Sequence, residues 1–165
     1  MILYAHTHSD LVNIAAKWLR NSKYKNGRCL GGPCPIIVTE LATMASEQPD
    51  ALGWHSGRTI LIEVKVSRSD FLADRKKPHR LNPSSGLGQI RWYLCPAGLL
   101  EADEMPDKWG LLWAMESGTV RVKKDPEMQE CNRHAEAHIL TSVIRRQAGW
   151  EPLHIDGRKT REETQ

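Results

Sequence analysis

Two charged residues interrupt an otherwise apolar run in the middle of the chain. The run Thr59–Val66 is rich in β-branched residues and is broken only by Glu63 and Lys65, which is typical of a buried strand. Because side chains alternate across a strand, Glu63 and Lys65 point to the same face as Leu61. Burying two ions is costly unless they pair or bind something. A simple salt bridge is one interpretation, and a chemically active pair is the one we favour.

A second carboxylate precedes this pair. Asp50 lies at the start of a predicted strand, Pro49–Trp54, and a turn at His55–Gly57 leads into the strand that carries Glu63. Two carboxylates can then converge, and Mg²⁺ or Mn²⁺ takes such oxygen ligands while water and phosphate complete its coordination. Beside that ion, Lys65 would position the attacking water or stabilise charge in the transition state. Hydrolysis of a phosphodiester bond is the reaction that fits.

The order of these motifs resembles a known family. Pro49-Asp50, then Glu63-Val64-Lys65, then a helix from Ser67, resembles the PD-(D/E)XK nuclease superfamily. The stretch Ile62–Lys77 is particularly similar to bacterial and phage nuclease-like proteins of the MmcB and VRR-NUC groups. The resemblance covers residues 36–115 and implies an α/β fold with a restriction-endonuclease-like core, a central mixed β-sheet flanked by helices.

The resemblance also implies roles for individual residues. Asp50, Glu63 and the Val64 carbonyl would bind the divalent metal, and Lys65 would position or activate water. Glu40 matches an acidic residue that many members carry upstream, and it would be a further metal ligand or proton acceptor. The resemblance therefore predicts a metal-dependent deoxyribonuclease.

A further motif of some family members, Gln-x-x-x-Tyr, is matched in spacing by Gln89 and Tyr93. In this chain the two residues lie in a Gly-rich loop that enters a predicted strand, and not clearly on a helix. We therefore treat Gln89 and Tyr93 as auxiliary site residues, and a coincidence of spacing is the alternative.

Basic side chains are concentrated between Lys65 and Arg80, where six Lys or Arg accompany two acids, Asp70 and Asp74. Such a cluster predicts a phosphate-binding surface, although a solvated helix face has the same appearance. Contacts to phosphates position a nucleic acid without reading its sequence. The residues that we assign to nucleic-acid binding are Arg68, Arg75, Lys76, Lys77, Arg80 and Arg91.

Two other functions are compatible with the sequence. The first is a module on the same fold that binds nucleic acid or a partner protein without turnover. The second is a structural zinc site drawn from Cys29, Cys34, Cys131 and His134. His134 and His138 also share a helix face, but their surroundings do not form a metalloprotease motif, so an exposed polar face is the simpler interpretation.

The elements that must position these residues follow from hydrophobic periodicity. Ser9 or Asp10 is placed to cap the first helix, and Ser67-Arg68-Ser69-Asp70 resembles a capping box at the start of the second. The predicted helices are Ser9–Arg20, Ser67–Lys77 and Glu127–Gln147, and the predicted strands are Ile36–Ala42, Pro49–Trp54, Thr59–Val66, Arg91–Cys95, Gly110–Met115 and Thr119–Lys123.

Length and composition are those of an ordinary globular protein. The 165 residues are 40% hydrophobic and 26% charged, with a net charge of +3, so we expect one domain over residues 1–155 and a polar, disordered tail over 156–165. No apolar run approaches the roughly 20 residues of a membrane span. We expect a cytoplasmic protein whose partner is nucleic acid, DNA in the first instance. A homodimer is one possible assembly, because many nucleases of this kind pair to cut both strands.

Overall fold

A six-stranded mixed sheet forms the centre of the computed structural model, which describes residues 6–21, 33–42 and 47–149. Neighbouring strands follow chain order. The central pairs β3–β4 and β4–β5 are parallel, and the remaining pairs are antiparallel. The predicted α/β class with a mixed sheet is therefore confirmed. The strands are β1 (Ile36–Thr39), β2 (Ala51–His55), β3 (Arg58–Val64), β4 (Ile90–Pro96), β5 (Trp109–Ala114) and β6 (Val120–Lys124).

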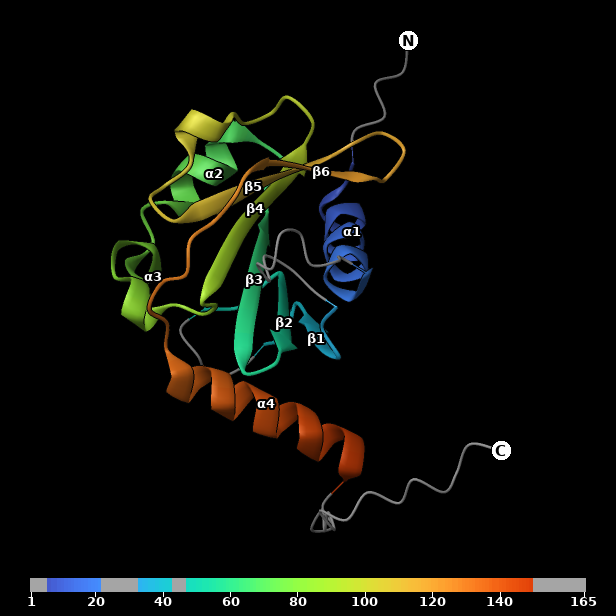
Figure 1. The fold of residues 1–165 in the computed structure, drawn as a ribbon, viewed down its shortest axis with the longest axis vertical. Helices are drawn as coiled ribbons and strands as arrows, with labels where there is room; N and C mark the ends of the chain where they lie inside the picture. Colours follow the sequence, from blue (N-terminus) through green and yellow to red (C-terminus); the bar gives the residue numbers. More distant parts are fainter. Residues whose placement is uncertain (1–5, 22–32, 43–46, 150–165) are drawn as a thin grey trace.

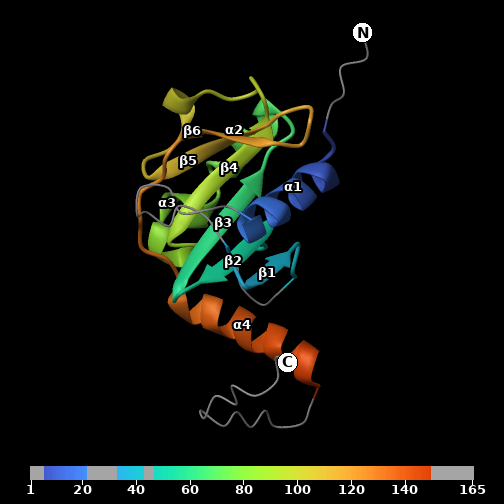
Figure 2. The same cartoon turned by 45° about the vertical axis from the view of Figure 1, so that its right-hand side comes forward.

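Helices lie on both faces of the sheet (Figures 1 and 2). Helix α1 covers one face, while α2 and α3 lie on the other, and α4 crosses the end of the sheet where the β2–β3 turn lies. The helices are α1 (His8–Asn21), α2 (Arg68–Asp74), α3 (Pro78–Leu81) and α4 (Arg133–Ala148), with short 3₁₀ turns at Pro83–Ser85 and Ala102–Glu104.

The alternation of side chains along β3 separates the two hydrophobic cores. Ile60 and Ile62 pack with Leu11 of α1 in one core. Leu61 packs with Phe71 of α2 in the other. The odd-numbered residues of β3 therefore face α2, which is the face predicted for Glu63 and Lys65.

Several predicted element ends differ from the observed ones. The first helix begins one residue earlier than predicted, and its cap is Thr7, whose hydroxyl accepts the Asp10 backbone N–H at 3.2 Å. The Thr7 N–H and hydroxyl donate to the Asp10 carboxylate in return, so Asp10 belongs to the first turn and is not the cap. In the second helix Ser67 does act as the cap and accepts the Asp70 N–H at 3.2 Å.

The last helix was predicted six residues too early. It begins at Arg133, after Asn132 caps it by accepting the Ala135 N–H at 3.0 Å. The preceding residues bond across to the loop before β4, because Gln129 N donates to Gln89 O and Asn132 N donates to Gly86 O. These long-range bonds hold residues 127–132 outside the helix despite their helical spacing.

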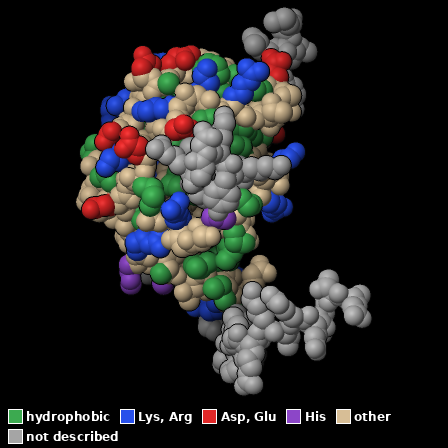
Figure 3. Space-filling model, in the orientation of Figure 1, with side chains coloured by type: hydrophobic (Ala, Val, Ile, Leu, Met, Phe, Trp, Pro, Cys, Tyr) green, Lys and Arg blue, Asp and Glu red, His purple; other side chains and the backbone are tan. Residues whose placement is uncertain are grey.

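Charges of both signs are mixed on the surface. On the face shown in Figure 3, Lys and Arg side chains are interspersed with Asp and Glu over the upper part of the molecule. None of the helices in the described ranges is long and apolar enough to cross a membrane. The tail predicted for residues 156–165 and Cys29 both lie outside the described residues.

Candidate active site

A hydrogen bond joins Asp50 to the strand that carries Glu63 and Lys65. Asp50 lies one residue before β2, and its Oδ2 accepts the Val64 backbone N–H at 2.8 Å. The antiparallel register pairs Ala51 with Ile62 and therefore brings Asp50 alongside Glu63. The turn between β2 and β3 thus brings the two carboxylates together, as the sequence predicted.

Glu63 and Lys65 lie on one face, 3.5 Å apart between Oε2 and Nζ, and each side chain is only 4% exposed. Lys65 is just past the end of β3, but its N–H still donates to Leu94 O at 2.9 Å and continues the pairing with β4. The backbone on either side is therefore fixed by the sheet. The two side chains project from a rigid platform.

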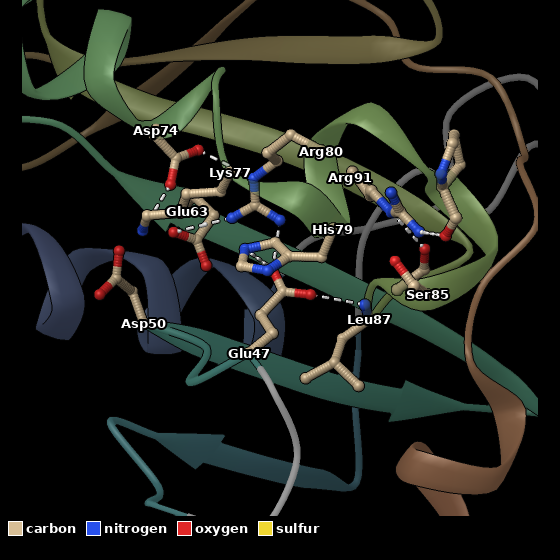
Figure 4. Close-up of polar contacts among 12 residues, drawn as sticks. Glu47, Asp50, Glu63, Asp74, Lys77, His79, Arg80, Ser85, Leu87 and Arg91 are labelled. Atoms are coloured by element: carbon tan, nitrogen blue, oxygen red, sulfur yellow. Dashed lines mark hydrogen bonds and ion pairs between the residues drawn. The ribbon is translucent and has the colours of Figure 1, made fainter.

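An arginine from α3 completes a buried ion cluster around this pair (Figure 4). Arg80 Nη2 lies 3.2 Å from Glu63 Oε2, and Arg80 Nε donates to Asp74 Oδ2 at 2.8 Å. Its Nη1 donates to Glu47. One guanidinium thus contacts three carboxylates, which together raise the pKa of Arg80 above its ordinary value although burial opposes the shift.

Asp74, the last residue of α2, receives most of the donors in this cluster. The Tyr93 hydroxyl donates to its Oδ2 at 2.8 Å, while Lys77 Nζ and Lys65 Nζ lie 2.8 and 3.6 Å from its Oδ1. Burial alone would raise the pKa of Asp74, but Arg80 and the two lysines outweigh it and hold that pKa well below its usual range. Asp74 is therefore a buried anion.

Glu63 and Asp50 are less well compensated. Burial raises the pKa of Glu63 to about 8, with Arg80 and Lys65 opposing the shift and Asp50 reinforcing it. Burial likewise raises the pKa of Asp50, and the Val64 N–H and Lys65 oppose this shift. Figure 4 shows Asp50 on the side of Glu63 away from Arg80. For neither carboxylate do the neighbouring cations outweigh the effect of burial on the pKa.

One oxygen of Glu63 has no donor. Among the described residues, the buried Oε1 of Glu63 has no hydrogen-bond partner, whereas Oε2 faces Lys65 and Arg80. A buried oxygen without a donor is costly, and a hard divalent cation is a partner that suits it. Asp50 and Glu63 therefore fit a metal site in which each contributes the oxygen not already engaged.

Glu40 lies at the rim of this site. The strand β1 ends at Thr39, three residues earlier than predicted, and Glu40 follows it with a φ of 48°. Its side chain is 53% exposed, and its carboxylate lies 3.4 Å from His8 Nε2, which is itself 3.5 Å from Asp50 Oδ1. Glu40 is thus connected to Asp50 through His8 and does not join the buried cluster.

Two of the arginines assigned to nucleic-acid binding are buried, and their burial contradicts that assignment. The Arg80 side chain is 4% exposed because it is enclosed by carboxylates. Arg91 is 0% exposed, and its guanidinium donates to the backbone carbonyls of Gly88, Pro83 and Glu130. Both arginines stabilise the interior and leave no guanidinium for a phosphate.

The other basic residues remain at the surface. Arg68 is exposed but donates to both carboxylate oxygens of Glu104, so its charge is already compensated. Arg75 and Lys76 are exposed at the end of α2. Lys77 is half-exposed and paired with Asp74. The surface available to phosphates is therefore smaller than the sequence predicted.

The two auxiliary residues, Gln89 and Tyr93, lie in different surroundings. Tyr93 is buried and joins the cluster through Asp74, and burial raises the pKa of its hydroxyl above the ordinary value. Gln89 precedes β4, and its side-chain oxygen accepts a hydrogen bond from Arg133 of α4. Gln89 and Tyr93 are four positions apart in extended chain, or about 13 Å, and neither residue lies on a helix. Only Tyr93 reaches the candidate site.

Sequence reasoning did not identify three members of the cluster. Asp74 lies three residues after Phe71, and both are buried on one face of α2, so helical spacing could have identified it. Glu47 receives the Leu87 N–H at 2.6 Å as well as Arg80, and His79 Nε2 lies 3.8 Å from it. No periodic pattern marks Glu47 or His79, because both depend on how distant segments meet.

Those alternative zinc ligands that lie within the described residues do not come together. Cys34 packs against α1 in one core, whereas Cys131 precedes α4 and His134 and His138 are exposed on that helix. Within residues 6–21, 33–42 and 47–149, no group of three or more His, Cys, Asp or Glu side chains is arranged to hold a metal ion. The Asp50–Glu63 pair is smaller than such a group, since it supplies only two carboxylates.

Comparison with protein-family models, with curated proteins and with solved structures gave no match for this chain. Membership of the nuclease superfamily that the motif resembles therefore stays a prediction. The geometry of the Asp50–Glu63–Lys65 cluster is the basis for a functional conclusion.

Proposed function

We propose that this protein is a metal-dependent nuclease that hydrolyses phosphodiester bonds of DNA on a restriction-endonuclease-like core of the PD-(D/E)XK type. The observation that carries the proposal is the bond from Val64 N–H to Asp50. It fixes a second carboxylate beside the buried Glu63–Lys65 pair. A structural ion pair needs no such third member, and burying an additional carboxylate costs stability.

Mg²⁺ or Mn²⁺ is the cofactor that suits these residues. Asp50 and Glu63 would bind it through their free oxygens, with the Val64 carbonyl as a third ligand. Because one oxygen of each carboxylate is already engaged, each offers a single oxygen, which suits a small octahedral ion better than Ca²⁺ with its seven or so ligands. When bound, the ion would polarise the phosphate and lower the pKa of a bound water.

Lys65 is the group that would act on the reacting atoms. Its ammonium is buried beside Glu63, where the low local dielectric makes its field stronger than at a surface. From this position it would hold the attacking water by a hydrogen bond and stabilise the negative charge that develops on phosphate oxygens. Glu40 at the rim, linked through His8, would supply a further carboxylate.

Arg75, Lys76 and Lys77 would hold the DNA backbone. They lie at or just after the end of α2, the helix that ends at Asp74, and so adjoin the cluster. Contacts of this kind fix position and not sequence. The proposal therefore places phosphate binding beside hydrolysis in one short stretch of chain.

Cleavage assays with purified protein test this function. Wild-type protein should cleave DNA with Mg²⁺ or Mn²⁺ and not with EDTA, and Asp50→Ala, Glu63→Ala and Lys65→Ala should each lower the rate by about a hundredfold or more. Glu136→Gln is the matched control, since Glu136 is a buried carboxylate that bonds Thr59 and Gly88 at the other end of β3. Undiminished cleavage by the three site variants would falsify the assignment.

A binding module without turnover is the second candidate. The observation that favours it is the pairing of Glu63 with both Arg80 and Lys65, which already compensates much of its charge. Such a module would bind DNA with salt-dependent affinity. Calorimetry with Mn²⁺ separates the two candidates, because the nuclease requires binding that Asp50→Ala and Glu63→Ala abolish, whereas the module requires none.

A further inference from the structure

Asp74 has more donors than a packing role requires. Its carboxylate is 1% exposed and lies within 2.8 Å of donor atoms of Arg80, Lys77 and Tyr93. The neighbouring Phe71 already fills the apolar contact of α2 with the sheet. Placing an anion where a hydrophobic residue would pack is costly for stability. A role in packing therefore does not explain the charge of Asp74.

The Lys65 ammonium lies between two carboxylates. Its Nζ is 3.5 Å from Glu63 and 3.6 Å from Asp74, and it lies 5.9 Å from the centre of the Tyr93 ring. A lysine has four flexible side-chain bonds, so one partner alone does not fix its ammonium. With Glu63 as the sole partner, the Lys65 ammonium could rotate around that carboxylate and would have no single fixed direction.

We propose that Asp74 is a positioning residue of the active site, which shares the Lys65 ammonium with Glu63 and thereby directs it towards the reacting phosphate. The inference rests on the proposed nuclease function. Tyr93 and Arg80 fix the Asp74 carboxylate in turn, since both donate to its Oδ2 and leave Oδ1 directed to the lysines. Asp74 thereby becomes part of the active site although it touches no substrate.

Two variants and a control test this role. Asp74→Asn keeps the shape but presents an amide in place of a charge to Lys65. Turnover should therefore fall by about 10- to 100-fold, the usual effect of losing a residue that orients another functional group. Tyr93→Phe removes one donor to Asp74 and keeps the ring stacked on Trp109, so turnover should fall roughly fivefold, as for one net hydrogen bond. The control is Glu136→Gln, a buried carboxylate with several donors.

The decisive readout is the division between turnover and binding. In both variants kcat should fall while the Mn²⁺ affinity measured by calorimetry stays at the wild-type value. The KM for DNA should also stay there in Tyr93→Phe, which leaves the ion pair between Asp74 and Lys77 intact. A general loss of structure would instead lower kcat and the Mn²⁺ affinity, raise the KM, and affect Glu136→Gln equally. Urea unfolding of each variant shows how far the fold has been destabilised, and Tyr93→Phe decides the question if Asp74→Asn does not fold.

The possible failures are distinguishable. Active wild-type protein with kcat unchanged in Asp74→Asn and Tyr93→Phe overturns the positioning role and leaves the nuclease intact. Loss of Mn²⁺ binding together with turnover also overturns it, because Asp74 would then act on the metal ligands. Wild-type protein that cleaves no DNA with either metal overturns the proposed function and this inference together.

Discussion

The Asp50 carboxylate accepts the Val64 backbone N–H at 2.8 Å. This bond ties a residue that precedes β2 to the backbone between Glu63 and Lys65. Only Oδ2 of Asp50 accepts this hydrogen bond, and Oδ1 lies 3.5 Å from His8 Nε2. Asp50 therefore has two separable properties, an acceptor that joins two strands and a negative charge beside Glu63.

Asp50→Asn separates these two properties. An amide oxygen can still accept the Val64 N–H, so the free energy of unfolding should stay close to wild type, and relief of repulsion with Glu63 should offset part of any loss. Mn²⁺ binding should be lost because the charge is gone. Urea unfolding and Mn²⁺ calorimetry measure the two effects. Asp50→Ala should lose both, including about 1–3 kcal/mol for the orphaned N–H, and equal Mn²⁺ affinity in Asp50→Asn and wild type would contradict the metal assignment.

The fold was predictable where one periodicity dominates. The β-branched run of β3 and the apolar stripe of α1 were both found, and their ends were right to within about two residues. The helical spacing of residues 127–132 predicts a helix there, and this prediction is wrong because Gln129 N–H and Asn132 N–H donate to the carbonyl oxygens of Gln89 and Gly86. Hydrogen bonds between distant segments leave no pattern in the local sequence, and such bonds determine where α4 begins.

The candidate site, like the fold, was predictable where a local periodicity places its residues. Strand alternation predicts that Glu63 and Lys65 share one face of the sheet, and the 3.5 Å between Glu63 Oε2 and Lys65 Nζ agrees with this prediction. The run of basic residues before Arg80 predicts a surface position for this side chain. Pro78 begins a separate short helix there, which turns Arg80 back into the interior, where it meets Glu47. A cluster of basic residues in a sequence does not show which of them are buried. The burial of Arg80 depends on carboxylates up to thirty-three residues away in the chain.

Arg80→Met should be strongly destabilising. It would leave Glu47, Glu63 and Asp74 without their shared cation, and the loss of one partner from a buried ion cluster costs about 3–5 kcal/mol. Urea unfolding measures the loss. The exposed Arg75→Met is the control and should change the free energy of unfolding by less than about 0.5 kcal/mol.

A double variant tests the cause of that loss. Glu47→Gln keeps an acceptor for the Leu87 N–H but removes one of the three charges. If uncompensated charge is the reason, Glu47→Gln with Arg80→Met should cost less than the sum of the two single changes. Strict additivity of the losses in unfolding free energy would show that Arg80 does not act through the charge of Glu47. Its packing against Trp109, with 4.9 Å between the guanidinium carbon and the ring centre, would then be the source.

His79 should make stability depend on pH near neutrality. Burial lowers the pKa of His79, aided by Arg80 and Lys77, while Glu47 and Asp74 oppose the shift. The unfolded chain therefore binds a proton at higher pH than the folded chain, and stability falls as pH drops through the ordinary value of 6.5. Urea unfolding at pH 7.5 and pH 5 measures this. Glu63, whose pKa is raised to about 8, acts in the opposite direction in both proteins. The change in stability from pH 7.5 to pH 5 should therefore be less unfavourable in His79→Gln than in wild type, and an equal change in both proteins would exclude His79 as a source.

The exposed basic residues should set the salt dependence of DNA binding. Arg75 and Lys76 are exposed beside the cluster, whereas Arg68 is already paired with Glu104. Each substitution that removes a phosphate-binding cation should lower the slope of log K against log salt by about 1. Titrations of a DNA duplex in Mg²⁺-free buffer at several salt concentrations should therefore give a slope smaller by about 2 for the double variant Arg75→Ala with Lys76→Ala, and a slope close to wild type for Arg68→Ala. A larger effect from Arg68→Ala would move the phosphate-binding surface to the start of α2.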